Sequence, residues 1–274
     1  MYSSKIGDLL VRTAMEVESL SKVLYFENGG TVPAGRDLYF DTDCLQLLDT
    51  KWNLSQKIVF VSSPFFYFVD TANIILTPLR KAHQRGSSSS KWQQAYQAVK
   101  HDRINNLKKG SIGNLIQALG ALYILNIYYR NASFDNLADK EASNIDWGLG
   151  SNIFSVKVSH ETSSVAINKI YVKKSDFDEC IYLVKHTDKS ANALMDVMKS
   201  VNKQIQDEIV SMVSGDRAFN NDNLLSDKVG DNSPNSSDQL ISEASKRVLD
   251  KEKYTIHDAY QKLRFEAVLN KNQY

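Results

Sequence analysis

The feature that most constrains the fold is an apolar pattern with helical spacing at the start of the chain. Between Ile6 and Leu24 the apolar side chains recur at i, i+3, i+4 and i+7, which is the spacing of one face of an α-helix. A second apolar run spans residues 112–129, and two asparagines and a glutamine within it favour a buried helix over a membrane span. We therefore expect a mainly α-helical fold built on two packed core helices, with no membrane attachment.

The charged side chains are nearly balanced in number but unevenly placed. The 274 residues carry 33 Lys plus Arg against 32 Asp plus Glu, a formal net charge of +1, which excludes a uniformly basic nucleic-acid-binding surface. Residues 79–110 nevertheless hold eight Lys or Arg against one acidic side chain, while residues 206–252 hold ten acidic side chains against five Lys or Arg. A polyanion such as RNA would prefer the basic middle of the chain, although a solvated lysine-rich connector would show the same pattern.

The sequence gives no sign of a cofactor or a metal. Cys44 and Cys180 belong to no CxxC or Cys/His ligand pattern, and the five histidines are scattered. The chain has no HExxH, GxSxG or GxxxxGK[ST] motif, and Gly148-Leu149-Gly150 lacks the third glycine of a dinucleotide fingerprint. The opening MYSSKIGDLL does not have the pattern of a secretory signal. We expect a cytoplasmic protein with neither cofactor nor metal.

The pattern along the chain predicts a bundle domain, a linker and a tail. Residues 1–213 are expected to form the helical bundle domain, in which residues 43–62 are either one helix or a helix followed by a short strand. Alternating side chains from residue 153 and a second apolar run predict a small inserted β-hairpin near residues 153–172. Residues 214–237 have the composition of a flexible linker, and residues 238–274 are expected to be a C-terminal helical tail, with helices at 238–251 and 255–269.

A long helix is expected before the linker. Ser175 and Asp178 have the spacing of a capping box, which predicts that this helix begins there and continues to about Val213.

The segment KWQQAYQAVKHDRINNL, residues 91–107, predicts a helix with an arginine on its core face. Trp92, Tyr96, Val99 and Arg103 fall within about 60° of the helical wheel, and His101 points about 160° away from Arg103. An inward guanidinium needs an anionic partner, because arginine cannot lose its charge inside a protein.

The first predicted helix offers that partner. Glu16 lies close to its apolar face and is the expected carboxylate for Arg103, with Glu18 as the alternative. Arg12–Glu16 and Glu18–Lys22 are also spaced as i, i+4 surface pairs. His101 and Arg103 could share one site only if their helix ended, bent or met another subunit.

Lys100-His101-Asp102-Arg103, the aromatic residues before it and the helix VRTAMEVESLSKVLY at residues 11–25 together carry a resemblance to a known family. Over roughly residues 5–130 the chain resembles the HEPN superfamily of helical prokaryotic proteins. That resemblance implies a helical bundle and a role in antiviral defence or toxin systems. Active members of the family are metal-independent endoribonucleases whose site forms across a dimer. Their usual pattern is an Arg followed four to six residues later by His, whereas His101 here precedes Arg103 by two residues.

The resemblance implies two alternative functions. In the first, the chain is an endoribonuclease in which His101 and Arg103 are catalytic, His101 acting as base or acid. The residues that would bind RNA or its phosphates are Lys100, Asn106, Tyr96, Lys108 and Lys109. The residues that would support the site are Glu16, Glu18 and Arg12. In the second, the chain is a non-catalytic interaction or dimerisation subunit of a larger complex, with Trp92, Tyr96 and Val99 only filling the core. RNA, a second copy of the chain or other subunits are the expected partners.

Overall fold

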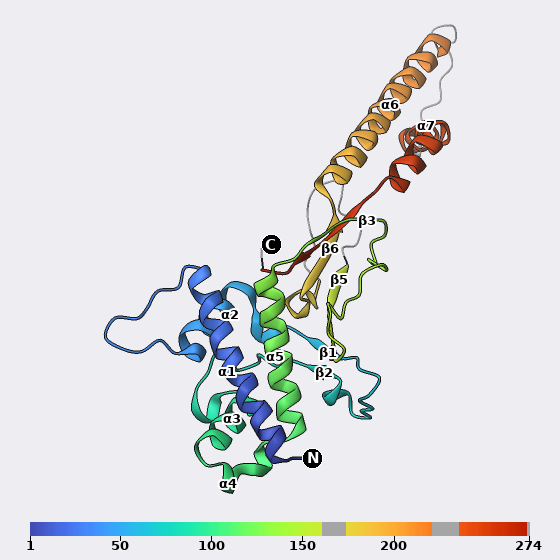
Figure 1. Ribbon diagram of the computed structural model, residues 1–274. Helices are drawn as coiled ribbons and strands as arrows, with labels where there is room; N and C mark the ends of the chain where they lie inside the picture. The colour runs from blue at the N-terminus through green and yellow to red at the C-terminus, as the bar shows by residue number, and fades with distance from the viewer. Residues whose placement is uncertain (161–173, 221–235, 273–274) are drawn as a thin grey trace, which may run out of the picture. The chain divides into compact units, whose positions relative to one another are not determined.

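A computed structural model describes residues 1–160, 174–220 and 236–272 of the chain. The described residues are mainly helical and form two units (Figure 1). The larger unit comprises residues 1–160, 174–185 and 266–272, and the helical-hairpin unit comprises residues 186–220 and 236–265.

Two long helices form the centre of the larger unit, as the apolar periodicity predicts. Helices α1 (Ser4–Glu27) and α5 (Ile112–Arg130) lie side by side (Figure 1). The Ser3 hydroxyl caps α1 by accepting a hydrogen bond from the Ile6 N–H at 3.2 Å, and the Ser111 hydroxyl caps α5. The buried face of α1 includes Leu10, Ala14 and Val17.

Helix α5 is also apolar and long enough to cross a membrane by length and composition. Half of the residues in this apolar stretch are buried within the larger unit. Among them, Ala118, Ala121, Ile124 and Leu125 have no exposed surface. Core helices of folded proteins have this composition as well, which agrees with the expected buried helix. The cytoplasmic location remains a prediction.

Shorter elements connect α1 to α5. Residues 43–62 were predicted to be either one helix or a helix followed by a short strand, and the structure shows a helix followed by a strand. The elements η1 (Phe40–Leu45), α2 (Gln46–Trp52) and η2 (Leu54–Gln56) lead into strand β1 (Val59–Val61). The chain continues through η3 (Thr71–Asn73), β2 (Ile75–Leu76), η4 (Gly86–Ser88), α3 (Lys91–His101), α4 (Arg103–Asn106) and η5 (Leu107–Lys109). The Trp52 ring stacks on the Tyr128 ring at 4.9 Å and joins α2 to α5.

Two small sheets take the place of the single expected hairpin. β1 pairs antiparallel with both β2 and β4 (Phe154–Val156), with Val59 opposite Leu76 and opposite Val156. The second sheet has the order β3-β7-β6-β5, formed by β3 (Phe134–Leu137), β7 (Phe265–Leu269), β6 (Tyr182–His186) and β5 (Val158–His160). β5 runs parallel to β6, with Val158 opposite Tyr182.

The alternating stretch that begins at residue 153 is therefore two strands in two sheets, separated by Lys157. Each half finds a partner remote in sequence, which a local pattern does not reveal. The other half of the expected hairpin, residues 165–172, lies outside the described residues.

Two helix predictions in the second half of the chain are wrong. The helix expected from Ser175 begins only at Asp188, because the turn η7 (Phe177–Glu179) and strand β6 come first. The apolar residues of β6 are almost wholly buried in its sheet, and this tertiary pairing overrides the capping signal. The helix expected at 255–269 ends at Gln261, and residues 265–269 are strand β7.

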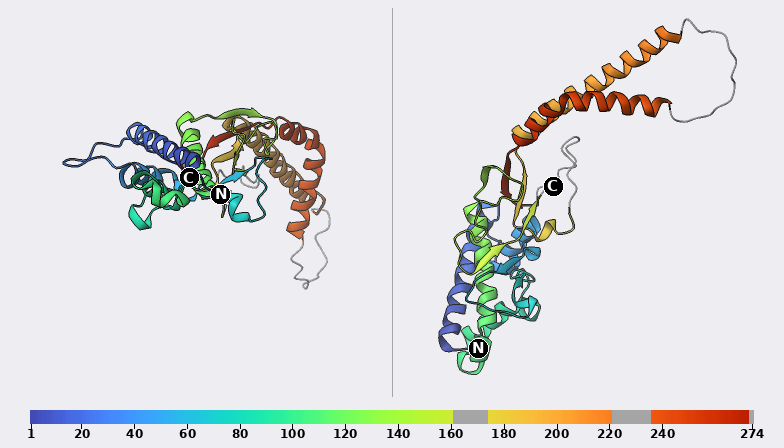
Figure 2. Two further views of the ribbon diagram at one scale, coloured as in Figure 1. Left: turned by 60° about the horizontal axis from the view of Figure 1, so that its bottom comes forward. Right: turned by 90° about the vertical axis from the view of Figure 1, so that its right-hand side faces the viewer.

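The main elements of the helical-hairpin unit are α6 (Asp188–Asn220) and α7 (Ser236–Gln261). They pack against each other near the start of α6 and the end of α7, and they diverge towards their other ends in the right-hand view of Figure 2. Leu194 and Val201 of α6 and Ala244 and Val248 of α7 form its buried seam. The predicted linker at 214–237 overlaps both helices, since residues 214–220 belong to α6 and residues 236–237 to α7. Residues 221–235 lie outside the described part of the chain.

Candidate functional site

The helix predicted over residues 91–107 breaks at Asp102. Helix α3 begins with a capping box between Ser90 and Gln93 and ends at His101. Asp102 has φ −149° and ψ 80°, and its side chain accepts a hydrogen bond from the Asn105 N–H at 3.3 Å, so that it caps the short helix α4. Aspartate competes with the helix backbone in this way, which ends α3 two residues before Arg103. We call residues 100–109 the basic turn.

Because of this break, the expected inward position of Arg103 is wrong. Its side chain is 44% exposed, and its Nη1 lies 2.5 Å from Oδ1 of Asp8, at the start of α1. The prediction that Glu16 or Glu18 receives this guanidinium is wrong as well, since Glu16 is exposed and Glu18 binds Lys22 at 2.8 Å. The Glu18–Lys22 surface pair is thus confirmed. Arg12 is exposed, and within the described part of the chain it forms no ion pair with Glu16.

The rest of the predicted core stripe is confirmed. Trp92, Tyr96 and Val99 are at most 2% exposed, and the Trp92 indole N–H donates to the Pro78 carbonyl at 2.8 Å. The Tyr96 hydroxyl accepts a hydrogen bond from Lys100 Nζ at 3.2 Å. A ring that is 1% exposed cannot stack on an RNA base, so the role of Tyr96 as an RNA contact is wrong and it fills the core instead.

The remaining predicted site residues lie at the surface of the basic turn. His101, Lys108 and Lys109 are exposed, and Asn106 is half-buried with its amide nitrogen donating to the Asp102 carbonyl at 2.9 Å. The His101 imidazole has no hydrogen-bond partner among the residues that the structure describes. The turn thus presents cations and an unrestrained imidazole to solvent, which suits contact with a flexible anion.

The predicted supporting residues do not reach the turn in the way expected. Asp8, which the sequence reasoning missed, is the carboxylate that contacts it. The sequence does place Asp8 on the first predicted helix, one helical turn before Arg12. Arg103 reaches this carboxylate only because the helix breaks at Asp102. No cluster of three His, Cys, Asp or Glu suited to a metal occurs in the described ranges.

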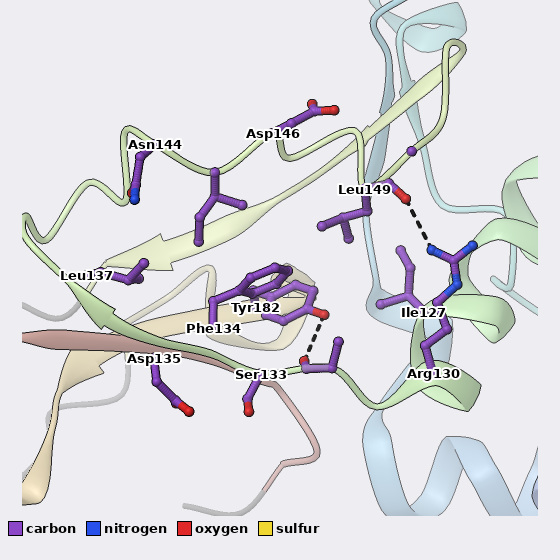
Figure 3. A pocket seen from close by; sticks show the side chains of 13 residues that line it. Ile127, Arg130, Ser133, Phe134, Asp135, Leu137, Asn144, Asp146, Leu149 and Tyr182 are labelled. Carbon is purple, nitrogen blue, oxygen red and sulfur yellow. Dashed lines mark hydrogen bonds between the residues drawn. The ribbon is translucent and has the colours of Figure 1, made fainter.

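A second site, which the sequence did not indicate, is a pocket of about 710 Å³ beside strand β3 (Figure 3). Apolar side chains of Ile127, Leu137, Leu149 and Phe134 line it, and the Tyr182 hydroxyl donates to the Ala132 carbonyl at 3.0 Å. Its lining residues come from α5, β3, the 144–150 loop and β6, which explains why no local motif pointed to it.

The charged groups of this pocket differ in direction. Arg130 closes one end, where its Nη1 donates to the Leu149 carbonyl at 3.2 Å. The carboxylates of Asp135 and Asp146 point away from the Tyr182 ring in Figure 3. Burial raises the pKa of Tyr182 to about 12, so its hydroxyl stays protonated and keeps donating at neutral pH. The pocket offers an apolar wall with a cation at its edge, and among the residues that the structure describes none directs a carboxylate or an imidazole into it.

Comparisons of the chain with protein-family models, with curated proteins and with solved structures found no match. The resemblance to the HEPN superfamily therefore neither gains nor loses support from relatives, and the function has to be argued from the geometry of the chain.

Proposed function

We propose that the basic turn binds RNA and that His101 and Arg103 form a metal-independent cleavage site there, in a HEPN-like protein of prokaryotic defence or toxin type. The observation that supports this most is the break at Asp102. On one continuous helix the two side chains would point about 160° apart, whereas the break removes that constraint and both side chains are exposed.

The chemistry needs groups that the turn contains. Cleavage of RNA without a metal requires a base for the 2′-hydroxyl and a cation for the charge that develops on the phosphate. The exposed imidazole of His101 is suited to the first task and the guanidinium of Arg103 to the second. Lys108 and Lys109 would contact neighbouring phosphates of a single strand.

The ion pair with Asp8 sets a condition on this proposal. The Asp8 carboxylate lies where a phosphate oxygen would have to approach the Arg103 guanidinium, so RNA must share or displace it. Asp8→Asn is therefore expected to tighten RNA binding several-fold, and Arg103→Ala to weaken it. These opposite signs separate a phosphate-binding role of Arg103 from a purely structural one, in which both variants would leave RNA affinity unchanged.

The test of catalysis is cleavage of a mixed single-stranded RNA pool in EDTA. Wild type is expected to cleave it, and His101→Ala is expected to abolish cleavage while leaving binding within a factor of about two, because the base acts only in the chemical step. His257→Ala, an exposed histidine on α7, is the matched control and is expected to cleave like wild type. No cleavage by wild type at high protein concentration, or full cleavage by His101→Ala, would contradict the catalytic part of the proposal.

The binding part has its own measurement. The logarithm of RNA affinity should fall linearly with the logarithm of salt concentration, and Lys109→Gln should reduce the slope by about 0.7, the value per phosphate contact on a single strand. Lys199→Gln on α6 is exposed and outside the basic turn, and it is expected to leave the slope unchanged.

A second candidate function is a non-catalytic interaction subunit, which the intramolecular contacts of the turn favour. Lys100 binds the Tyr96 hydroxyl, Arg103 binds Asp8, and the amide of Asn106 binds the backbone, so three of the predicted site residues also serve the fold. In this case wild type neither cleaves nor binds the RNA pool, and the lysine substitution has no effect.

A further inference from the structure

The pocket beside strand β3 adjoins a second pocket of about 350 Å³ along helix α5. Ile127, Arg130, Leu149 and Gly150 line both pockets, so the two meet at these residues. The hydrogen bond from Arg130 to the Leu149 carbonyl lies on their border. We call the two pockets together the α5 groove, and all of its lining residues belong to the larger unit.

The smaller pocket is lined mainly by apolar side chains, which are those of Leu119, Leu122, Ile127, Leu149, Ile153 and Phe154. Its uncharged polar side chains already have partners within the fold. The Tyr123 hydroxyl donates to the Gly148 carbonyl at 2.8 Å, and the Asn126 amide nitrogen donates to the Leu122 carbonyl at 2.9 Å. The Ser151 hydroxyl accepts a hydrogen bond from the Phe154 N–H at 3.0 Å. The surface left for a ligand is therefore apolar, and it favours a hydrocarbon group.

Arg130 supplies the charge of the smaller pocket, and helix α5 carries no other charged residue. Its side chain is exposed, and within the described part of the chain it forms no ion pair. A guanidinium has five N–H donors, so Arg130 can bind a carboxylate without giving up its hydrogen bond to Leu149.

The acidic residues of the larger pocket are directed elsewhere. Asp146 accepts a hydrogen bond from the Gly148 N–H at 2.8 Å, and in Figure 3 its carboxylate and that of Asp135 point away from the Tyr182 ring. The α5 groove thus combines an apolar lining with a positive charge at the point where its two pockets meet.

The backbone at this border has an unfavourable conformation. Leu149 has φ 50° and Gly150 has φ 87°, both in the left-handed region. A leucine is rarely found there, and residues held in such conformations are concentrated at functional sites, ligand clamps among them. The conformation directs the Leu149 carbonyl to Arg130 and the Leu149 side chain into the larger pocket (Figure 3).

We propose that the α5 groove binds a free apolar monocarboxylate, such as a medium-chain fatty acid. Its carboxylate accepts hydrogen bonds from Arg130, and its hydrocarbon chain lies in the smaller pocket, along α5 towards Leu119. The helix from residue 119 to residue 130 is roughly 16 Å long, which gives room for such a chain. A carboxylate matches the cation of the groove, whereas a cationic ligand would meet like charge there. This inference does not depend on RNA binding or cleavage.

Calorimetric titration of the full chain tests the chemistry of the ligand. Octanoate, 1-octanol and octyltrimethylammonium have hydrocarbon chains of equal length and differ in charge. Octanoate is expected to bind about fivefold more tightly than 1-octanol, which is the factor for an exposed ion pair, and octyltrimethylammonium more weakly than either. No binding of octanoate, equal binding of octanoate and 1-octanol, or tighter binding of octyltrimethylammonium would overturn the proposal.

Two variants test the position of the ligand. Arg130→Gln should lower the affinity for octanoate about fivefold and leave both the affinity for 1-octanol and the melting temperature unchanged, whereas Arg12→Gln, an exposed arginine on α1, should bind like wild type. Leu119→Gln puts an amide into the smaller pocket and should weaken binding of both ligands, whereas Leu9→Gln, 51% exposed on α1, should weaken neither. An octanoate affinity that either pocket variant left unchanged would contradict the assigned position.

Sedimentation with vesicles separates a free carboxylate from a lipid headgroup. Wild type is expected to stay in the supernatant with phosphatidylglycerol vesicles. Sedimentation of wild type that Arg130→Gln abolishes would show that Arg130 binds a membrane surface, and it would overturn the proposal.

Discussion

The Arg103 guanidinium lies 2.5 Å from the Asp8 carboxylate, so this ion pair connects the basic turn to helix α1. Both side chains are close to half exposed, at 44% and 49%. An ion pair in this environment is screened by water and contributes little to folding. The relationship therefore bears on what the guanidinium can bind more than on stability.

The first prediction concerns this pair. A double-mutant cycle of Asp8→Asn and Arg103→Gln, measured by urea unfolding, should give a coupling free energy of about 0.2–1 kcal/mol. A coupling of about 3 kcal/mol would show instead that the pair is desolvated in solution.

The second prediction concerns Asn270, which has no exposed surface and connects three parts of the larger unit. Its Nδ2 donates to the backbone carbonyls of Phe177 at 2.6 Å and Cys180 at 3.0 Å, and its backbone carbonyl accepts a hydrogen bond from the Tyr128 hydroxyl at 2.6 Å. Asn270→Ala withdraws two donors from buried carbonyls and should lower the free energy of unfolding by about 2–4 kcal/mol in urea titrations. The exposed Asn144→Ala should change it by less than about 0.5 kcal/mol. Equal effects of the two would contradict the buried network.

The third prediction concerns acid stability. Hydrogen bonds from Arg36, both at 2.6 Å, lower the pKa of Asp43 from 3.8 to about 2. Because the pKa is lower in the folded state, the carboxylate stabilises the fold above about pH 4, and this contribution is lost as the pH falls towards 2. Asp43→Asn should thus be less stable than wild type at pH 6, and the gap should narrow by pH 2.5 in urea titrations at each pH. For the exposed Asp135→Asn no such gap is expected at pH 6, and a gap for Asp43→Asn that widened in acid would reverse the assigned sign.

The fourth prediction concerns two glycines. A Cβ on Gly30 would lie 2.3 Å from Cδ1 of Tyr25, whose ring is held by a hydrogen bond from its hydroxyl to the Thr31 carbonyl at 2.7 Å. Gly30→Ala should destabilise the protein by about 1–3 kcal/mol, since the ring cannot move without losing that bond. Gly113→Ala, in α5 with open space around the new Cβ, should raise stability by about 0.5–1 kcal/mol. Thermal unfolding of both variants measures the difference, and a neutral Gly30→Ala would mean that the Tyr25 ring can shift without loss of stability.

The parts of the fold that could be predicted are those set by local periodicity. Helices α1 and α5 follow from the spacing of their apolar side chains, because one helix face needs only nearby residues to be recognised. The sequence of residues 43–62 also allowed the observed helix followed by a strand, although its apolar periodicity could not distinguish this arrangement from a single helix.

The parts that could not be predicted depend on pairing or on close competition. Strand β7 lies between β3 and β6, and residues 265–269 have an apolar content that fits a helix equally well until those neighbours are known. At the candidate site, a single capping contact from Asp102 outweighed one more helical turn and moved Arg103 from the predicted core to the surface. A helical wheel for residues 91–107 assumes one continuous helix, so it cannot predict whether the helix breaks at Asp102.

The order β3-β7-β6-β5 also fixes an order of events during synthesis. The interior strand β7 is synthesised after both helices of the helical-hairpin unit, so β3 and β6 are made before the strand that lies between them. The hairpin helices contact mainly each other and can form earlier, and at their base the Thr187 N–H bonds the Arg264 carbonyl at 3.0 Å. A hairpin formed first would bring the two ends of a long intervening segment together and lower the entropy lost on closing the sheet. Helices α6 and α7 would then bring Thr187 and Arg264 together before β7 pairs with its neighbours.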